Sequence, residues 1–237
     1  DIIASLYHNP LPIVSSDGPD YLTWSDLKLL IFGATYQPRL MFPFVADILA
    51  TIEQGGGSAT DQLASMFHYN HVLFCPANGT EASDTPVPDV ATTAILCGDG
   101  IDQTHLTRDE FEAYWNIMDT LSPNFGSYWS MLLMSCAAWK IKASYKFEGP
   151  YGGNTSHPIL FISNTADPVT PLRSGRYMHS LFPDSSLLIS DHVGHCSISA
   201  PDICSLSRVK AYFQTGELPS PGTVCVPPPS PYSLNST

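Results

Sequence analysis

The sequence predicts an α/β protein whose C-terminal part contains parallel strands and whose N-terminal part is mostly helical. Two short apolar runs, 158–163 and 186–190, are bounded by turn residues and have the length and branched or aromatic content of buried strands. Between them, 171–182 carries apolar residues at helical spacing. A strand–helix–strand unit of this kind pairs its two strands in parallel.

Composition is consistent with a folded protein that binds neither nucleic acid nor an anionic membrane surface. The chain has 237 residues, of which 43% are hydrophobic, enough for a substantial core. Its formal charge is −12 and its pI is near 4.8, which opposes binding to polyanions. No apolar run approaches the length of a membrane span.

The region from residue 1 to about 75 shows helical patterns of apolar residues. A helix is expected over 24–32, with Ser25 or Asp26 as its N-terminal cap. A second is expected over 42–52, and 61–67 is a candidate for a third. This part of the sequence contains nothing that is catalytic by itself.

A polar, proline-bearing stretch at 76–90 predicts a surface loop. The segment 91–100 follows with a short apolar run that ends at Cys97 and Asp99, and 92–97 is a third candidate strand.

Later segments predict further helices. Thr107 and the acidic residues after it form a capping-box pattern at the start of one helix, and 129–139 predicts another. A final helix is expected over 203–213, followed by proline-rich coil over 219–231.

Each predicted parallel strand ends in a turn that holds a titratable residue, Asp167 after the first and His195 after the second. Open parallel sheets carry their chemistry at the carboxyl ends of the strands. An acid followed by a histidine matches the chain order of the last two members of a Ser–acid–His triad. Singly, each is an ordinary turn residue. His192 is an alternative base, and Asp184 and Asp191 are alternative acids that flank the second strand.

Three motifs carry a family resemblance. They are the stretch Pro-Ile-Leu-Phe-Ile-Ser-Asn-Thr-Ala-Asp-Pro-Val-Thr-Pro at 158–171, the pair Gly194-His195, and the tail 211–225. Together they resemble the C-terminal part of tripeptidyl-aminopeptidase-like (TAP-like) α/β-hydrolases, which are secreted serine exopeptidases and their relatives. The family places its catalytic histidine after a glycine, which selects His195 over His192.

The resemblance also implies a domain organisation. It assigns 1–150 to a helical lid, with 91–100 as the segment that returns the chain to the active-site rim, and 151–237 to the end of the hydrolase core. On that return segment Asp99 is a candidate ligand for a substrate ammonium group, because a buried cation requires a partner. The alternative is a turn aspartate between two glycines.

Six cysteines do not by themselves fix their pairing. The resemblance implies one disulfide between Cys97 and Cys136 and another between Cys204 and Cys225. Cys75 and Cys196 are left over, and Cys196 is expected as a buried free thiol beside His195.

Three N-glycosylation sequons, at Asn78, Asn154 and Asn235, indicate a secreted, extracellular protein. The first residues are not a signal peptide, so one is expected to have been removed or to precede this chain. No metal-binding signature is present, and neither a metal nor a cofactor is expected.

The nucleophile motif of the fold, Gly-x-Ser-x-Gly, does not occur in the 237 residues. The nearest string, 55–59, lacks a preceding strand. We therefore expect an N-terminal fragment of the same precursor to carry the serine, in a peptidase that acts on peptides. Alternatives are ester cleavage or a non-hydrolytic step on a small molecule, and a non-catalytic binding remnant.

Overall fold

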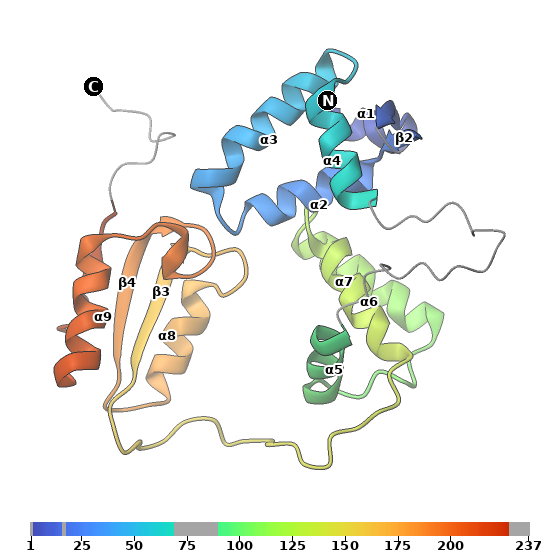
Figure 1. The fold of residues 1–237 in the computed structure, drawn as a ribbon. Coiled ribbons are helices and arrows are strands. Elements are labelled where there is room, and N and C mark those ends of the chain that lie inside the picture. Colours follow the sequence, from blue (N-terminus) through green and yellow to red (C-terminus); the bar gives the residue numbers. More distant parts are fainter. Residues whose placement is uncertain (1, 16–17, 69–89, 228–237) are drawn as a thin grey trace, which may run out of the picture. The chain divides into compact units, whose positions relative to one another are not determined.

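The computed structural model describes residues 2–15, 18–68 and 90–227, and Figure 1 shows the helices and strands that these residues form. The expectations for Cys75, Asn78 and Asn235 lie outside these residues. The chain forms two compact units, Asp1–Leu29 with Ala50–Glu148, and Leu30–Leu49 with Gly149–Thr237. The lid assigned to 1–150 stays a prediction, and residues 30–49 pack with the second unit.

The first unit begins with a short helix and a β-hairpin. Helix α1 (Ile2–His8) leads into β1 (Leu11–Ser15), which pairs antiparallel with β2 (Gly18–Leu22). The helical pattern expected over residues 1 to about 75 does not extend to this hairpin. Pro12 and Pro19 lack a backbone N–H and disfavour a helix interior, and the buried Ile13 next to the exposed Val14 has the two-residue period of a strand.

Further helices follow the hairpin along the described chain. They are α2 (Trp24–Ala34), α3 (Pro38–Glu53), α4 (Ser58–His68), α5 (Val90–Asp99), α6 (Arg108–Leu121) and α7 (Gly126–Ala137). The helices expected over 24–32, 42–52, 61–67 and 129–139 are confirmed within a few residues. α4 packs on the hairpin, and α7 packs on both α5 and α6.

Two helix starts carry side-chain caps. At α6 the predicted capping box is present, since Thr107 accepts from the Glu110 N–H and Glu110 accepts from the Thr107 N–H at 2.9 Å. At α2 the cap is Thr23 rather than Ser25 or Asp26. Asp26 instead accepts the Thr23 N–H at 2.8 Å, so it completes a second box of the same kind.

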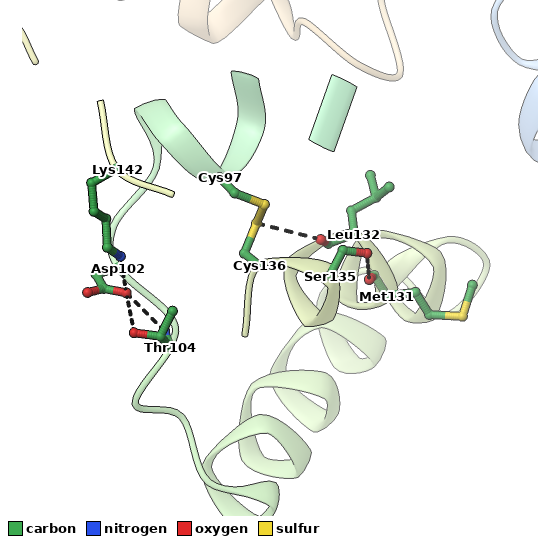
Figure 2. The surroundings of a disulfide bond; sticks show 8 residues. All are labelled: Cys97, Asp102, Thr104, Met131, Leu132, Ser135, Cys136 and Lys142. Carbon is green, nitrogen blue, oxygen red and sulfur yellow. Dashed lines mark hydrogen bonds and ion pairs between the residues drawn. A yellow bond between two sulfur atoms is a disulfide. The ribbon is translucent and has the colours of Figure 1, made fainter. Parts of the chain in front are cut away.

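The candidate strand at 92–97 is a helix, α5. A short apolar run has no period that separates a buried strand from a buried helix. A helix satisfies its backbone hydrogen bonds internally. α5 also directs the buried Cys97 toward Cys136 on α7, and the structure joins the two sulfur atoms in a disulfide (Figure 2).

Asp102, which follows α5, pairs with Lys142, and that hydrogen-bonded ion pair is the main reason that the pKa of Asp102 lies well below its ordinary range.

The second unit contains a parallel sheet in the order β3-β4-β5. β3 (Leu160–Ala166), α8 (Leu172–Ser180) and β4 (Ser186–Val193) form the predicted strand–helix–strand unit, and α9 (Ile203–Thr215) is the predicted final helix. Figure 1 shows α8 and α9 flanking the strands. Leu187 and Leu188 of β4 are buried, as expected for the middle strand of this sheet.

Strand β5 (Val224–Cys225) falls in the region expected as coil. It pairs in parallel with β4 and is tied to α9 by the disulfide between Cys204 and Cys225. Two residues are too few for periodicity to reveal a strand. Closing a loop with a sequence separation of 21 contributes about 3 kcal/mol in the chain-entropy model.

No helix among the described residues has the length and apolar character needed to cross a membrane.

The contact between α6 and α7 predicts the effect of a methyl group at Gly126. A Cβ there would overlap the Met118 carbonyl oxygen, which belongs to the backbone and has no rotamer to change. We expect Gly126→Ala to lower the free energy of unfolding by about 1–3 kcal/mol through overpacking. Thermal or denaturant unfolding measures this change.

Gly33 provides a matched control, because it also lies in a helix but has no atom within 4 Å of the added Cβ. Gly33→Ala should be neutral or stabilise by about 0.5–1 kcal/mol. Equal effects of the two substitutions would contradict the close approach at Gly126.

Candidate active site

Asp167 and His195 meet at the carboxyl edge of the parallel sheet. Asp167 directly follows the end of β3, while His195 follows the end of β4 after Gly194. Ala166 and Val193 are opposite each other in the register, and the Gly194 N–H continues the pairing by donating to the Ala166 carbonyl at 3.1 Å. The two turns therefore start side by side.

The register shifts just before this edge. Asn164 pairs with Ser190, but Ala166 pairs with Val193, so β4 has one more residue in this interval than β3. An extra residue of this kind bends a strand and changes which way the following side chains point. The shift thus sets the direction in which the chain leaves β4 toward His195.

The geometry separates the predicted pair from its alternatives. His195 Nδ1 lies 3.1 Å from Asp167 Oδ1 and 3.2 Å from Oδ2. Asp191 instead accepts from the Thr165 hydroxyl at 3.0 Å, and Nδ1 of the buried His192 bonds to the Val193 carbonyl at 3.0 Å. Within the described part of the chain, Asp167 is the one carboxylate bonded to His195.

The Asp167 contact fixes the roles of the two imidazole nitrogens. An ionised carboxylate only accepts hydrogen bonds, so Nδ1 carries the hydrogen and Nε2 of the neutral ring is left to accept a proton. Among residues 2–15, 18–68 and 90–227, no group is hydrogen-bonded to Nε2. The His195 side chain is 24% exposed and that of Asp167 3% exposed, so the pair has a buried acid and an accessible base.

The turn after β3 surrounds the Asp167 carboxylate with donors. Oδ1 accepts the backbone N–H groups of Val169 and Thr170, both at 2.8 Å. Oδ2 accepts the Thr170 hydroxyl at 2.8 Å and the Cys196 N–H at 3.0 Å. An aspartate that bonds the backbone two and three residues ahead is a common turn-former, and here the turn also orients the acid.

These donors decide the protonation state of Asp167. Burial is the largest single influence and would raise the pKa of Asp167, but the hydrogen bonds from Thr170, Cys196 and Val169 together outweigh it and lower the pKa to about 2. The carboxylate is therefore ionised at neutral pH and can stabilise a positive charge on His195.

The segment between α2 and α3 also contacts His195. The His195 N–H donates to the Tyr36 carbonyl at 2.8 Å, and the Tyr36 ring meets the imidazole edge-on with centroids 5.1 Å apart. Tyr36 lies in Leu30–Leu49, which packs with the second unit. A segment expected as lid thus takes part in positioning the candidate base.

Cys196 is exposed, so the expectation of a buried free thiol is wrong. Its backbone has φ 64°, and its N–H is directed to Asp167. The backbone rather than the sulfur therefore makes the inward contact. Partial desolvation and the Asp167 charge raise the pKa of the thiol above its ordinary value, which does not favour a reactive thiolate.

A possible metal-ligand set, Asp202 with Cys204 and Cys225, has its ligand atoms within 4.8 Å of one another. Both sulfurs belong to the disulfide that ties α9 to β5, so neither is available as a thiolate ligand.

Comparison with known proteins finds a family similarity within the second half of the chain. A family model described as TAP-like protein, of the α/β-hydrolase type, matches residues 122–225. This segment belongs to the TAP-like family. No curated protein matches the chain. The TAP-like segment spans Asp167, His195 and both residues of the disulfide between Cys204 and Cys225.

Two further predicted sites are Asp99 and Asn154. Asp99 precedes the TAP-like segment, and it is the exposed last residue of α5 in the first unit. Its role as a ligand for a substrate ammonium stays a prediction. Asn154 lies within the segment and is exposed, so its side chain is accessible, and its glycosylation also stays a prediction.

The site also contains residues that were not predicted from the sequence. Thr170 stands three positions after Asp167, a spacing typical of aspartate turns, so this signal was present in the sequence. Asn164 and Tyr36 gave no such signal, because one lies inside a strand and the other is remote in sequence from His195.

The low pKa of Asp167 predicts a specific acid sensitivity. A carboxyl with a folded pKa of about 2 and an ordinary value of 3.8 contributes stability above about pH 4 and loses it as the pH falls toward 2. The difference in free energy of unfolding between the wild type and Asp167→Asn should shrink over that range. A difference that is independent of pH, or a carboxyl resonance of Asp167 that titrates near 4, would contradict the assignment.

The turn before His195 requires glycine. Gly194 has φ +110°, and a Cβ there would lie 2.8 Å from Pro38 Cδ and from Ser199 Cβ. We expect Gly194→Ala to displace His195 and to lower the free energy of unfolding by more than about 2 kcal/mol, because backbone strain and overpacking add. Unfolding curves measure this change.

Gly153 is the matched control, since its φ is +125° but nothing lies within 4 Å of the added Cβ. Gly153→Ala should show only the strain, about 1–2 kcal/mol. The steric argument fails if both variants lose the same stability.

Proposed function

We propose that this chain supplies the acid and the base of a serine hydrolase of peptidase type. The observation that carries the proposal is the contact of 3.1 Å between His195 Nδ1 and Asp167 Oδ1, made by a carboxylate that stays ionised at neutral pH. Membership of residues 122–225 in the TAP-like family supports a hydrolase.

In the proposed mechanism, His195 Nε2 removes the proton from a serine hydroxyl as the serine oxygen attacks the scissile carbonyl. His195 then returns that proton to the leaving amine. In the second half of the reaction, His195 takes a proton from water as the water oxygen attacks the acyl carbonyl, and then gives it to the departing serine oxygen. Asp167 keeps its charge throughout and stabilises the imidazolium. The oxyanion donors and the serine lie outside this chain.

The serine is proposed to come from a Gly-x-Ser-x-Gly turn in an N-terminal fragment of the same precursor. Parallel sheets are normally covered on both faces and contain several strands. The described sheet has three strands, one of them with two residues, and β3 pairs on one side only. Large apolar side chains on α9 are also exposed, Ile203 at 87% and Phe213 at 81%. A further polypeptide that extends the sheet and covers these side chains accounts for both features.

We propose peptides with a free N-terminus as substrates, with Asp99 as the ligand for the terminal ammonium. The support is the family resemblance and the exposure of the Asp99 carboxylate in the first unit. A secreted location is proposed from the two disulfides and the sequons at Asn78, Asn154 and Asn235.

Replacing the base tests the proposed function directly. His195→Ala in the complete protein should lower kcat for an aminoacyl or tripeptidyl anilide by at least about 10³-fold, because the serine loses its proton acceptor. Labelling by a fluorophosphonate should fall in parallel. A corresponding ester assayed beside the anilide distinguishes peptidase from esterase activity.

His157→Ala is the control, since His157 is exposed and its ring bonds only to the neighbouring Ser156 within the described chain. It should keep kcat within about twofold of the wild type. Full activity in His195→Ala would refute the proposed role of His195.

A further inference from the structure

Asn164 occupies a buried position directly beneath the turn that carries His195. It lies in β3, and the residue is 1% exposed. Burying a side-chain amide costs free energy unless its polar atoms form hydrogen bonds. Here the pairing is concentrated on one atom, Nδ2, while Oδ1 has no hydrogen-bond partner among the described residues.

The partners of Nδ2 lie on either side of the candidate base. Nδ2 donates to the Gly194 carbonyl at 2.8 Å and to the Cys196 carbonyl at 2.8 Å. The reversed amide would place a carbonyl oxygen against two other carbonyl oxygens, which have no hydrogen to share. The surroundings therefore assign the NH₂ group to this side of the amide.

We infer that Asn164 is a positioning residue that holds the backbone on both sides of His195, so that the imidazole meets Asp167. This inference rests on the proposed function of the pair. Asn164 touches neither the imidazole nor the carboxylate through any hydrogen bond of the described structure, so its effect passes through the peptide groups that it binds.

The other peptide groups of the turn are fixed in different directions. The Gly194 N–H donates to Ala166, the His195 N–H to Tyr36, and the Cys196 N–H to Asp167. Without Asn164, the Gly194 carbonyl would lose its partner, and the Cys196 carbonyl would keep only its bonds from the Ser199 N–H at 3.1 Å and the Ser199 hydroxyl at 2.8 Å. The positive φ angles at Gly194 and Cys196, +110° and 64°, are conformations that such bonds must hold in place.

Substituting Asn164 in the complete protein tests the inference. Asn164→Ala should lower kcat by at least about tenfold with KM changed less than about threefold, because substrate binding is unaffected and the base is misplaced. Asn164→Asp presents a carboxylate to two carbonyl oxygens, so near pH 8 its kcat should be as low as that of Asn164→Ala. When protonated it regains one donor, so its kcat relative to the wild type should rise as the pH falls.

Each pH point is compared with the wild type, because other ionisable side chains lie in or beside this turn, namely Asp167, Asp191, His192, His195 and Cys196. Ser186→Ala is the control. The Ser186 hydroxyl is buried and donates to the Pro219 carbonyl at 2.9 Å, so its loss also removes a buried bond to a carbonyl, at the opposite end of β4. Ser186→Ala should leave kcat within about twofold.

Hydrogen exchange of the Cys196 amide gives a readout that needs no activity. This amide bonds to Asp167, and its exchange should accelerate at least about tenfold in Asn164→Ala but not in Ser186→Ala. Faster exchange in a protein without hydrolase activity would overturn the proposed function and leave the positioning role standing. The positioning role is overturned by wild-type kcat in Asn164→Ala, by a parallel loss of kcat in Ser186→Ala, by an Asn164→Asp ratio that does not change with pH, or by unchanged exchange.

Discussion

The parallel pairing of β3 with β4 is the constraint on which the candidate site depends. Backbone hydrogen bonds place Ala166 opposite Val193, and the residues that follow them carry the acid and the base. Asp167 and His195 are 28 positions apart in sequence, so only a crossover that returns the chain in parallel brings them within 3.1 Å. The register shift between Asn164 and Ala166 then sets how the chain approaches this edge.

A second constraint is that the same hydrogen-bond donors both position the Asp167 carboxylate and keep it ionised. The N–H groups of Val169, Thr170 and Cys196 and the Thr170 hydroxyl hold Asp167 in place. Together they also outweigh the burial that would raise its pKa. Preorganised donors of this kind lose little when charge develops on the neighbouring histidine. Stability and the proposed chemistry therefore depend on one set of hydrogen bonds.

The sequence predicted those parts of the fold in which local pattern and burial agree. The strand–helix–strand unit over 158–190, the capping box at Thr107 and the last helix each have a clear period or cap. The candidate strand at 92–97 failed because an apolar run of that length has no period that distinguishes strand from helix. The hairpin at the start and the two-residue β5 depend on pairing with other segments, which a single segment does not reveal.

The residues of the candidate site also fall into two groups, those that could be predicted from the sequence and those that could not. The turn chemistry around the acid and the glycine before the base are visible in sequence, so Asp167 and His195 could be selected from it. The residues that hold His195 in place could not, because Tyr36 reaches it through a carbonyl and Asn164 through two peptide groups. Any residue type supplies a backbone carbonyl, so such contacts leave no trace in the sequence.

The most direct test of the central claim is a crystal structure of the complete protein after reaction with a fluorophosphonate. We predict that the phosphonate is bonded to a serine of a Gly-x-Ser-x-Gly turn outside these 237 residues. That serine Oγ should lie within about 3.2 Å of His195 Nε2, with Asp167 on the opposite side of the ring. A phosphonylated serine remote from His195, or an Nε2 bonded to a group other than the serine or the phosphonate, would contradict the claim.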